Sequence, residues 1–166
     1  MGHRGRSMEQ DELIAHLRWV FERQLHWISA ADVKAGGMIG AYMALAAIAA
    51  TLLDSASPPA TTKLLFVVAG ITMIPALACA VAVFFPRIDA PRSSSIYFGE
   101  IAQQDATKFI ERRQSKADIT QDLLGQIFIN AQIATCKHKF AKISILIGAA
   151  SLAVWIGAVA TLMGAA

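Results

Sequence analysis

Three long stretches of the chain contain no charged residue and no histidine: residues 35–53, 64–85 and 143–166. They are 19, 22 and 24 residues long. A helix rises about 1.5 Å per residue, so roughly 20 apolar residues cross a hydrocarbon core of about 30 Å. The pattern predicts three transmembrane helices, and we expect an all-α membrane protein.

Helical periodicity also marks the N-terminal segment, residues 1–34. From Glu9 to Ala31 its apolar residues recur at helical spacing, with charged residues between them, and neither proline nor glycine occurs from Glu9 until Gly36. We expect one amphipathic helix continuous with the first span. The alternative is a helix lying flat on the lipid surface, anchored by Trp19 and Trp27. The apolar stripe comprises Leu13, Leu17, Val20, Phe21, Trp27 and Ile28, and Ile14 and Leu25 widen it.

The segment 86–142 between the second and third spans has two predicted helix starts. Ser93–Ser95 can cap a helix that begins near Ile96. Ser115 and Asp118 form a capping-box pattern, and no proline follows them. We therefore expect a helical hairpin whose second helix, of about 47 residues, continues into the third span. This hairpin and the N-terminal helix would form a cytoplasmic helical stalk.

The basic residues predict the orientation. Five of the 15 Lys and Arg residues precede the first span, one is Lys63 in the loop 54–63, nine lie in residues 86–142, and none follows the third span. Short cytoplasmic loops carry the excess of Lys and Arg. We expect a cytoplasmic N-terminus, an external loop 54–63 and a periplasmic C-terminus. This orientation also explains the pI of about 9.1, so no nucleic-acid partner is expected.

The sequence gives no support for catalysis. The two cysteines, Cys79 and Cys136, suggest no disulfide framework, and the four histidines have no metal-binding spacing. The glycines form no phosphate-binding loop. We expect no catalytic residue, no metal site and no cofactor.

Asp32 lies at the predicted inner boundary of the membrane, where a carboxylate needs a cationic partner. Lys34, two residues along the same helix, cannot face it. We expect an interhelical ion pair between Asp32 and one of Arg87, Lys139 and Lys142. Either the pair is a bridge that fixes the register of the spans, or the remaining cations also form a basic site for a phosphate or an anionic lipid.

Small residues and one proline mark the predicted spans. Gly36 and Gly40 lie on the first span, and Gly148 and Gly157 on the third, at spacings that allow close helix packing. Pro75 predicts a kink in the second span. Three spans cannot enclose a water-filled pore alone, so any channel activity requires a homo-oligomer.

Four motifs, in order along the chain, resemble the Pycsar effector transmembrane family. They are Ile28–Gly36, Phe85–Arg87, Ser93–Ile101, and Asp122–Ile127 leading to Lys137–Lys139. The resemblance implies a bacterial inner-membrane protein of antiphage defence. In such systems a cyclase makes cyclic CMP or cyclic UMP, and the effector then impairs the membrane.

The matched residues suggest a ligand site but carry no assigned nucleotide contact. Our hypothesis is that Tyr97 or Phe98 stacks on a pyrimidine while cations hold the cyclic phosphate. Alternatively, both aromatic residues pack the stalk. The full candidate set comprises Lys34, Arg87, Arg92, Ser94, Tyr97 and Phe98. The alternative function is a non-enzymatic membrane scaffold whose stalk docks another protein.

Overall fold

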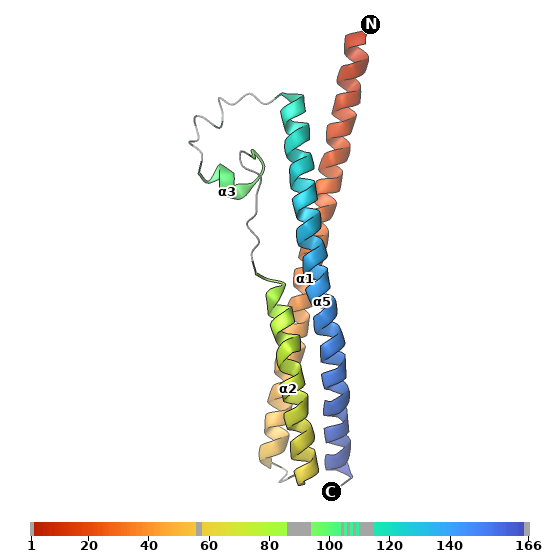
Figure 1. Ribbon diagram of the computed structural model, residues 1–166, viewed down its shortest axis with the longest axis vertical. Coiled ribbons are helices and arrows are strands. Elements are labelled where there is room, and N and C mark those ends of the chain that lie inside the picture. Colours follow the sequence, from red (N-terminus) through yellow and green to blue (C-terminus); the bar gives the residue numbers. More distant parts are fainter. Residues whose placement is uncertain are drawn as a thin grey trace. The chain divides into compact units, whose positions relative to one another are not determined.

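The computed structural model describes residues 2–55, 58–85, 94–103, 105, 107, 109 and 115–164. Its helices are α1 (Gly2–Ser55), α2 (Ala60–Ala82), α3 (Phe98–Ile101) and α5 (Lys116–Met163) (Figure 1). No strand occurs among these residues. The all-α prediction is confirmed for the described chain.

Helices α1, α2 and α5 are each long and apolar enough to cross a membrane. The prediction of three such helices is therefore confirmed. Helix α1 ends at Ser55 and α2 begins at Ala60, so both helices extend into the predicted loop 54–63. The membrane boundaries and the orientation stay predictions.

Both long helices are continuous, as predicted. Helix α1 has 54 residues, with no break between its N-terminal part and the first apolar stretch. Helix α5 has 48 residues and begins at the predicted capping box. There the Ser115 N–H donates to Asp118 Oδ2 at 3.0 Å, and the Asp118 N–H donates to Ser115 Oγ at 3.2 Å. The helix predicted to start near Ile96 is described as the short α3, and residues 110–114 lie outside the described part.

The chain divides into two compact units. The head unit consists of Met1–Ser29 and Pro86–Thr135, and the span unit consists of Ala30–Phe85 and Cys136–Ala166. The head unit carries 20 of the 27 residues that are Asp, Glu, Lys or Arg. The charged residues are therefore concentrated in the head unit, and its placement in water stays a prediction.

The core of the head unit is formed by large aliphatic side chains of α1 and α5. Ile14, Leu17, Leu123 and Ile127 are buried together. Val20, Phe21, Ile96 and Ile119 pack against them. The predicted stripe on α1 was wrong in part, because the structure leaves Leu13, Leu25 and Trp27 about half exposed. The buried face is centred on Ile14 and Leu17 instead.

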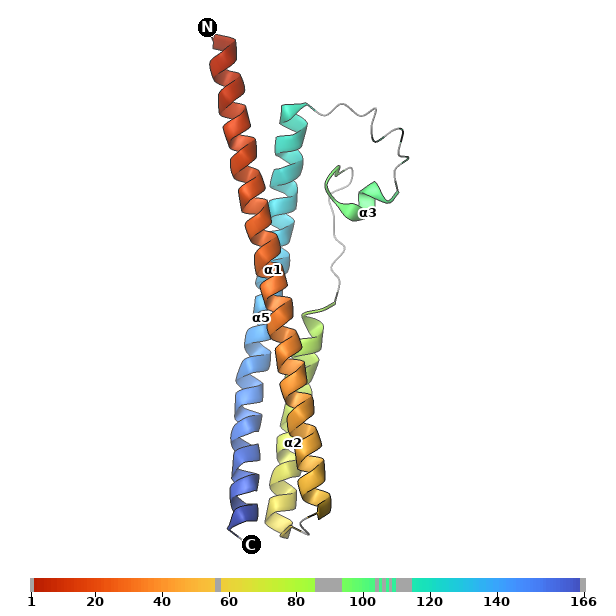
Figure 2. The same cartoon turned by 180° about the vertical axis from the view of Figure 1, so that it is seen from behind.

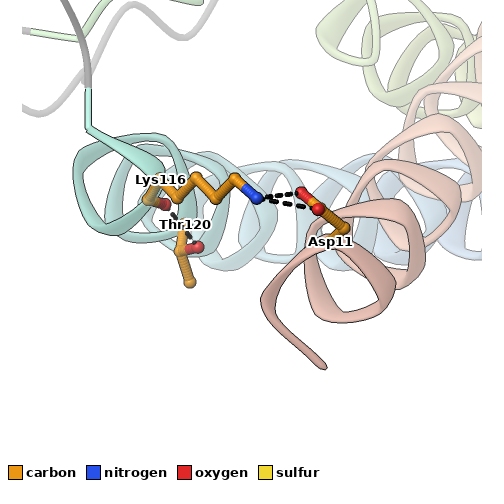
Figure 3. Close-up of polar contacts among 3 residues, drawn as sticks. All are labelled: Asp11, Lys116 and Thr120. Carbon is orange, nitrogen blue, oxygen red and sulfur yellow. Dashed lines mark hydrogen bonds and ion pairs between the residues drawn. The ribbon is translucent and has the colours of Figure 1, made fainter. Parts of the chain in front are cut away.

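An ion pair links the two long helices at the surface of the head unit. Lys116 Nζ lies 2.7 Å from each carboxylate oxygen of Asp11, while the Thr120 hydroxyl donates to the Lys116 carbonyl (Figure 3). Both charged side chains are largely exposed. Such a pair contributes only about 0–1 kcal/mol, so the apolar contacts dominate the packing of this unit.

The span unit packs α2 against the second half of α1 and the second half of α5 (Figure 1 and Figure 2). The buried contacts are made mostly by small side chains. One cluster consists of Ala31, Ala35, Val83 and Ala141. The other consists of Tyr42, Met73, Ala76 and Ala80. Small residues let helix backbones approach closely, as is typical of helices packed in lipid.

Ten buried or half-buried residues of α1 follow one repeat with alternating steps of three and four residues. This is the heptad spacing of helices that pack along their length. In the head unit the repeat is mostly large and apolar, and from Ala31 onward it combines two alanines with Met38, Tyr42 and Leu45. Its members are Ile14, Leu17, Phe21, Gln24, Ile28, Ala31, Ala35, Met38, Tyr42 and Leu45.

Candidate functional site

In the head unit, Asp122 of α5 fixes the segment before α3. Its carboxylate accepts hydrogen bonds from the Ser94 hydroxyl at 2.6 Å, the Ser95 hydroxyl at 2.6 Å and the Ser95 N–H at 2.7 Å. Three donors on one carboxylate satisfy most of its hydrogen-bonding capacity. This polar contact holds residues 94–96 against α5.

The Ser94 hydroxyl is fully used within the protein. It donates to Asp122 and accepts from Gln126 Nε2 at 3.1 Å. It also accepts the backbone N–H groups of Ile96 at 3.2 Å and Tyr97 at 3.1 Å. Ser94 is only 2% exposed. Its geometry is that of a structural cap for the turn leading into α3, which occupies the groups that a ligand contact would need.

A pocket of about 340 Å³ lies next to this segment, within the head unit. Its polar groups come from Arg18 of α1 and from Ser95, and two phenyl rings, of Phe21 and Phe109, contribute to its apolar wall. The remaining lining residues are Ile96, Ile119 and Leu123. Among the described residues, no carboxylate forms an ion pair with Arg18, whose side chain is exposed. The pocket thus combines one cation with a mainly apolar and aromatic surface.

The span unit contains an interhelical ion pair at Asp32, but with a different partner from the predicted ones. Lys137 Nζ of α5 donates to Asp32 Oδ1 at 2.5 Å. The expectation of Lys139 or Lys142 was wrong because both side chains are exposed, while Lys137 is 12% exposed. Helical periodicity explains the choice. Lys137 shares a face of α5 with the buried residues Ala134, Ala141 and Ser144.

Three exposed cations lie within a few residues of this pair along α1 and α5. Lys34, Lys139 and Lys142 are all exposed, and none forms an ion pair with a described residue. Arg87, the third predicted partner of Asp32, lies outside the described residues. Among the described residues, the predicted inner membrane boundary therefore has one carboxylate, Asp32, which is paired with Lys137, and three further positive charges.

Farther along the span unit, α5 is joined to α1 and α2 by buried hydrogen bonds. The Tyr42 hydroxyl donates to the Ser144 carbonyl at 2.8 Å. The Ser144 hydroxyl donates to the Ala76 carbonyl at 2.8 Å, and the Ser151 hydroxyl donates to the Ala69 carbonyl at 2.7 Å. Ser144 and Ser151 are completely buried. These bonds satisfy polar groups inside the unit and fix the register of α5 against α2.

The four predicted packing glycines have different environments. A Cβ atom on Gly148 would overlap the Tyr42 ring, so any larger residue there requires that ring to move. A Cβ atom on Gly36 would make an ordinary contact with Phe84 Cζ at 3.9 Å. Gly40 and Gly157 have no described atom within 4 Å of that position. Among the four glycines, the close approach of α5 to α1 therefore depends on Gly148.

Pro75 lies inside α2, which continues as a helix on both sides of it. The predicted kink at this residue stays a prediction.

The predicted nucleotide-binding residues fall into three groups. Ser94 and Tyr97 belong to the head unit, where the Tyr97 ring lies over Gly99. Lys34 belongs to the span unit. Arg87, Arg92 and the side chain of Phe98 lie outside the described part of the chain.

Several residues of these sites were missed by sequence reasoning. Arg18 and Phe21 were assigned only to an amphipathic helix, and Asp122 and Gln126 only to a motif of the resemblance. The sequence did contain a signal for Asp122. It is a carboxylate next to the apolar position Leu123 in the first turns of a helix, and such a carboxylate needs hydrogen-bond donors from another segment. Among the described residues, no group of three or more His, Cys, Asp or Glu side chains could hold a metal ion.

Comparison with known proteins gives one match. The profile of the Pycsar effector protein domain matches residues 16–164. No curated protein and no solved structure matches significantly. The matched range includes the pocket, the Asp122 contacts, the Asp32 ion pair and the buried serines.

Proposed function

The chain belongs to the Pycsar effector transmembrane family, and from this premise we propose that it impairs the inner membrane in response to a cyclic pyrimidine nucleotide. Membership makes it an antiphage membrane effector. The proposal adds the ligand, cyclic CMP or cyclic UMP, and a homo-oligomer as the active form. The observation that carries it is the extent of the family match, which covers nearly the whole chain.

The composition of the two units supports a division of labour. The head unit carries most of the charge and the pocket, which suits it to meet a soluble ligand on the cytoplasmic side. The span unit supplies the apolar helices. With the N-terminus and residues 86–142 in the cytoplasm, as the basic residues predict, the head unit lies where a cyclase product accumulates.

An oligomer follows from the size of the span unit. The unit contributes three helices that could span a membrane. Three spans are too few to enclose a water-filled path, so a conducting path requires several copies. The ligand would act by binding one packing state of this oligomer more tightly than the other. Asp32 and Lys137 then serve to hold the resting arrangement of α1 and α5.

Dye release from liposomes tests this proposal. Liposomes that contain the purified chain receive cyclic CMP, cyclic UMP, cyclic AMP or cyclic GMP separately. We expect release with one pyrimidine nucleotide and none with the purine nucleotides. If inserted and folded protein releases no dye with any of the four, a gated membrane effector is the wrong reading, and the scaffold function is favoured.

A further inference from the structure

We propose that the head-unit pocket between α1, α5 and residues 95–96 is the binding site for a small organic anion that carries a phosphate and a flat ring. This inference rests on the proposed function, in which that anion is a cyclic nucleoside monophosphate. It differs from the site suggested by the sequence motifs, because its cation is Arg18 and its rings are Phe21 and Phe109.

The size of the pocket favours a single mononucleotide. Small-molecule pockets typically have about 300–1,000 Å³. With about 340 Å³, this pocket is at the lower end, where one nucleotide fits and a dinucleotide does not. All of its lining residues belong to the head unit.

The charge of the pocket favours an anion. Arg18 has no carboxylate partner among the described residues, so its guanidinium is available for a phosphate. A guanidinium presents paired N–H donors that match two phosphate oxygens. Asp122 accepts hydrogen bonds from Ser95, a lining residue of the pocket, and its three hydrogen bonds already compensate its charge.

The apolar lining favours a ring. Phe21 and Phe109 contribute phenyl groups, and Ile96, Ile119 and Leu123 complete the apolar surface. A phosphate ion alone would make few favourable contacts with such a surface. Stacking of a base on an aromatic side chain contributes about 1–3 kcal/mol by alanine substitution, and every base has a suitable face. The pocket therefore recognises a ring and a phosphate together.

Ligand binding would also bear on the contact between α1 and α5. Arg18 and Phe21 come from α1, Ile119 and Leu123 from α5, and Leu123 and Phe21 belong to the core of the head unit. A ligand that contacts both helices stabilises the arrangement of α1 and α5 to which it binds more tightly. The site is thus placed to convert binding into a change of helix packing.

The test is equilibrium dialysis of labelled cyclic CMP and cyclic UMP against the purified chain in detergent, with liposome dye release measured in parallel. Arg18→Gln is the test variant and Arg23→Gln is the matched control. Arg23 lies on the same helix, is also exposed, and its guanidinium carbon lies 5.8 Å from the centre of the Trp19 ring, outside the pocket. Because both arginines are exposed, neither change disturbs the core. Ribose 5-phosphate serves as the probe that has a phosphate but no base.

We expect Arg18→Gln to raise the Kd at least about tenfold, which corresponds to about 1.4 kcal/mol. Arg23→Gln should stay within about twofold of the unmodified chain, and ribose 5-phosphate should bind at least about tenfold more weakly than the nucleotide. Equal affinities of Arg18→Gln and Arg23→Gln would overturn the pocket, while nucleotide-triggered dye release would leave the proposed function standing. Absence of binding to the unmodified chain overturns the pocket as well, and the release assay then decides whether the proposed function falls with it.

Discussion

The head unit and the span unit bury different kinds of side chain, although the same two long helices contribute to both. The head unit buries Leu and Ile and carries its ion pair on the surface. The span unit buries mainly Ala and Ser, and its hydroxyl groups donate to carbonyl oxygens of the neighbouring helix. In water, burial of large apolar groups drives packing, whereas in lipid it gives no such gain. The difference agrees with the predicted placement of the head unit in water and the span unit in lipid.

The largest expected effect comes from removing an aliphatic side chain of the head-unit core. Leu123→Ala should lower the stability of the head unit by about 2–5 kcal/mol, because Leu123 is 3% exposed and its loss leaves a cavity. The neighbouring Leu124, which is 40% exposed, provides the control Leu124→Ala. Hydrogen–deuterium exchange of the amides of residues 116–130 measures the change. Equal exchange in the two variants would contradict an apolar core as the basis of this unit.

A large side chain at Gly148 should have the next largest effect, this time in the span unit. Gly148→Leu forces the side chain against the Tyr42 ring and should cost about 1–3 kcal/mol. Gly157→Leu, with open space at its Cβ position, should have little effect. Unfolding in mixed micelles by SDS, followed by circular dichroism, compares the two. If Gly157→Leu proves as harmful as Gly148→Leu, close packing within the chain is not the role of Gly148.

Loss of one buried hydroxyl should have a smaller effect. Ser144→Ala removes the donor to the Ala76 carbonyl and should cost about 0.6 kcal/mol, the average for interhelical hydrogen bonds in a membrane protein. The same SDS titration measures it, and Thr72→Ala is the control, because the Thr72 hydroxyl bonds only carbonyls of its own helix. A loss comparable to that of Leu123→Ala would show that polar contacts dominate the span unit.

The smallest effect is expected at the exposed ion pair. Lys116→Ala should change the stability of the head unit by about 0.3 kcal/mol, because Asp11 and Lys116 are both largely solvated. Hydrogen–deuterium exchange at low and high salt measures it, and the difference should vanish at high salt. A loss above about 1 kcal/mol that persists in salt would mean that this contact is a structural element of the head unit.

The sequence predicted the helices well, because their signals are local. Long uncharged stretches mark the spans, and the Ser115 and Asp118 pair marks the start of α5 within one residue. The predicted stripe on α1 failed at Leu13 and Trp27 because an amphipathic pattern does not show which edge of a wide apolar face is covered. The true face becomes visible only with the partner helix in place.

The site residues were harder to predict because they depend on contacts between distant segments. The need for a cation near Asp32 follows from the cost of an isolated carboxylate, but the choice of Lys137 depends on the rotation of α5. Likewise, the sequence alone allowed Ser94 to contact a ligand. The structure shows that its hydroxyl is already bonded to Asp122 and Gln126. The pocket at Arg18 had no sequence signal, since its walls come from four separated segments.

The unbroken repeat along α1 restricts how this chain can change in length. An insertion of one residue near Ser29 would turn every later residue of the helix by about 100° relative to the earlier ones. Ala31, Ala35 and Tyr42 would then leave the face that continues from Ile14 and Leu17. An insertion of seven residues would restore the phase almost completely. Viable length variants of this helix should therefore differ by whole heptads, and evolution within it should proceed by substitution more readily than by single insertions or deletions.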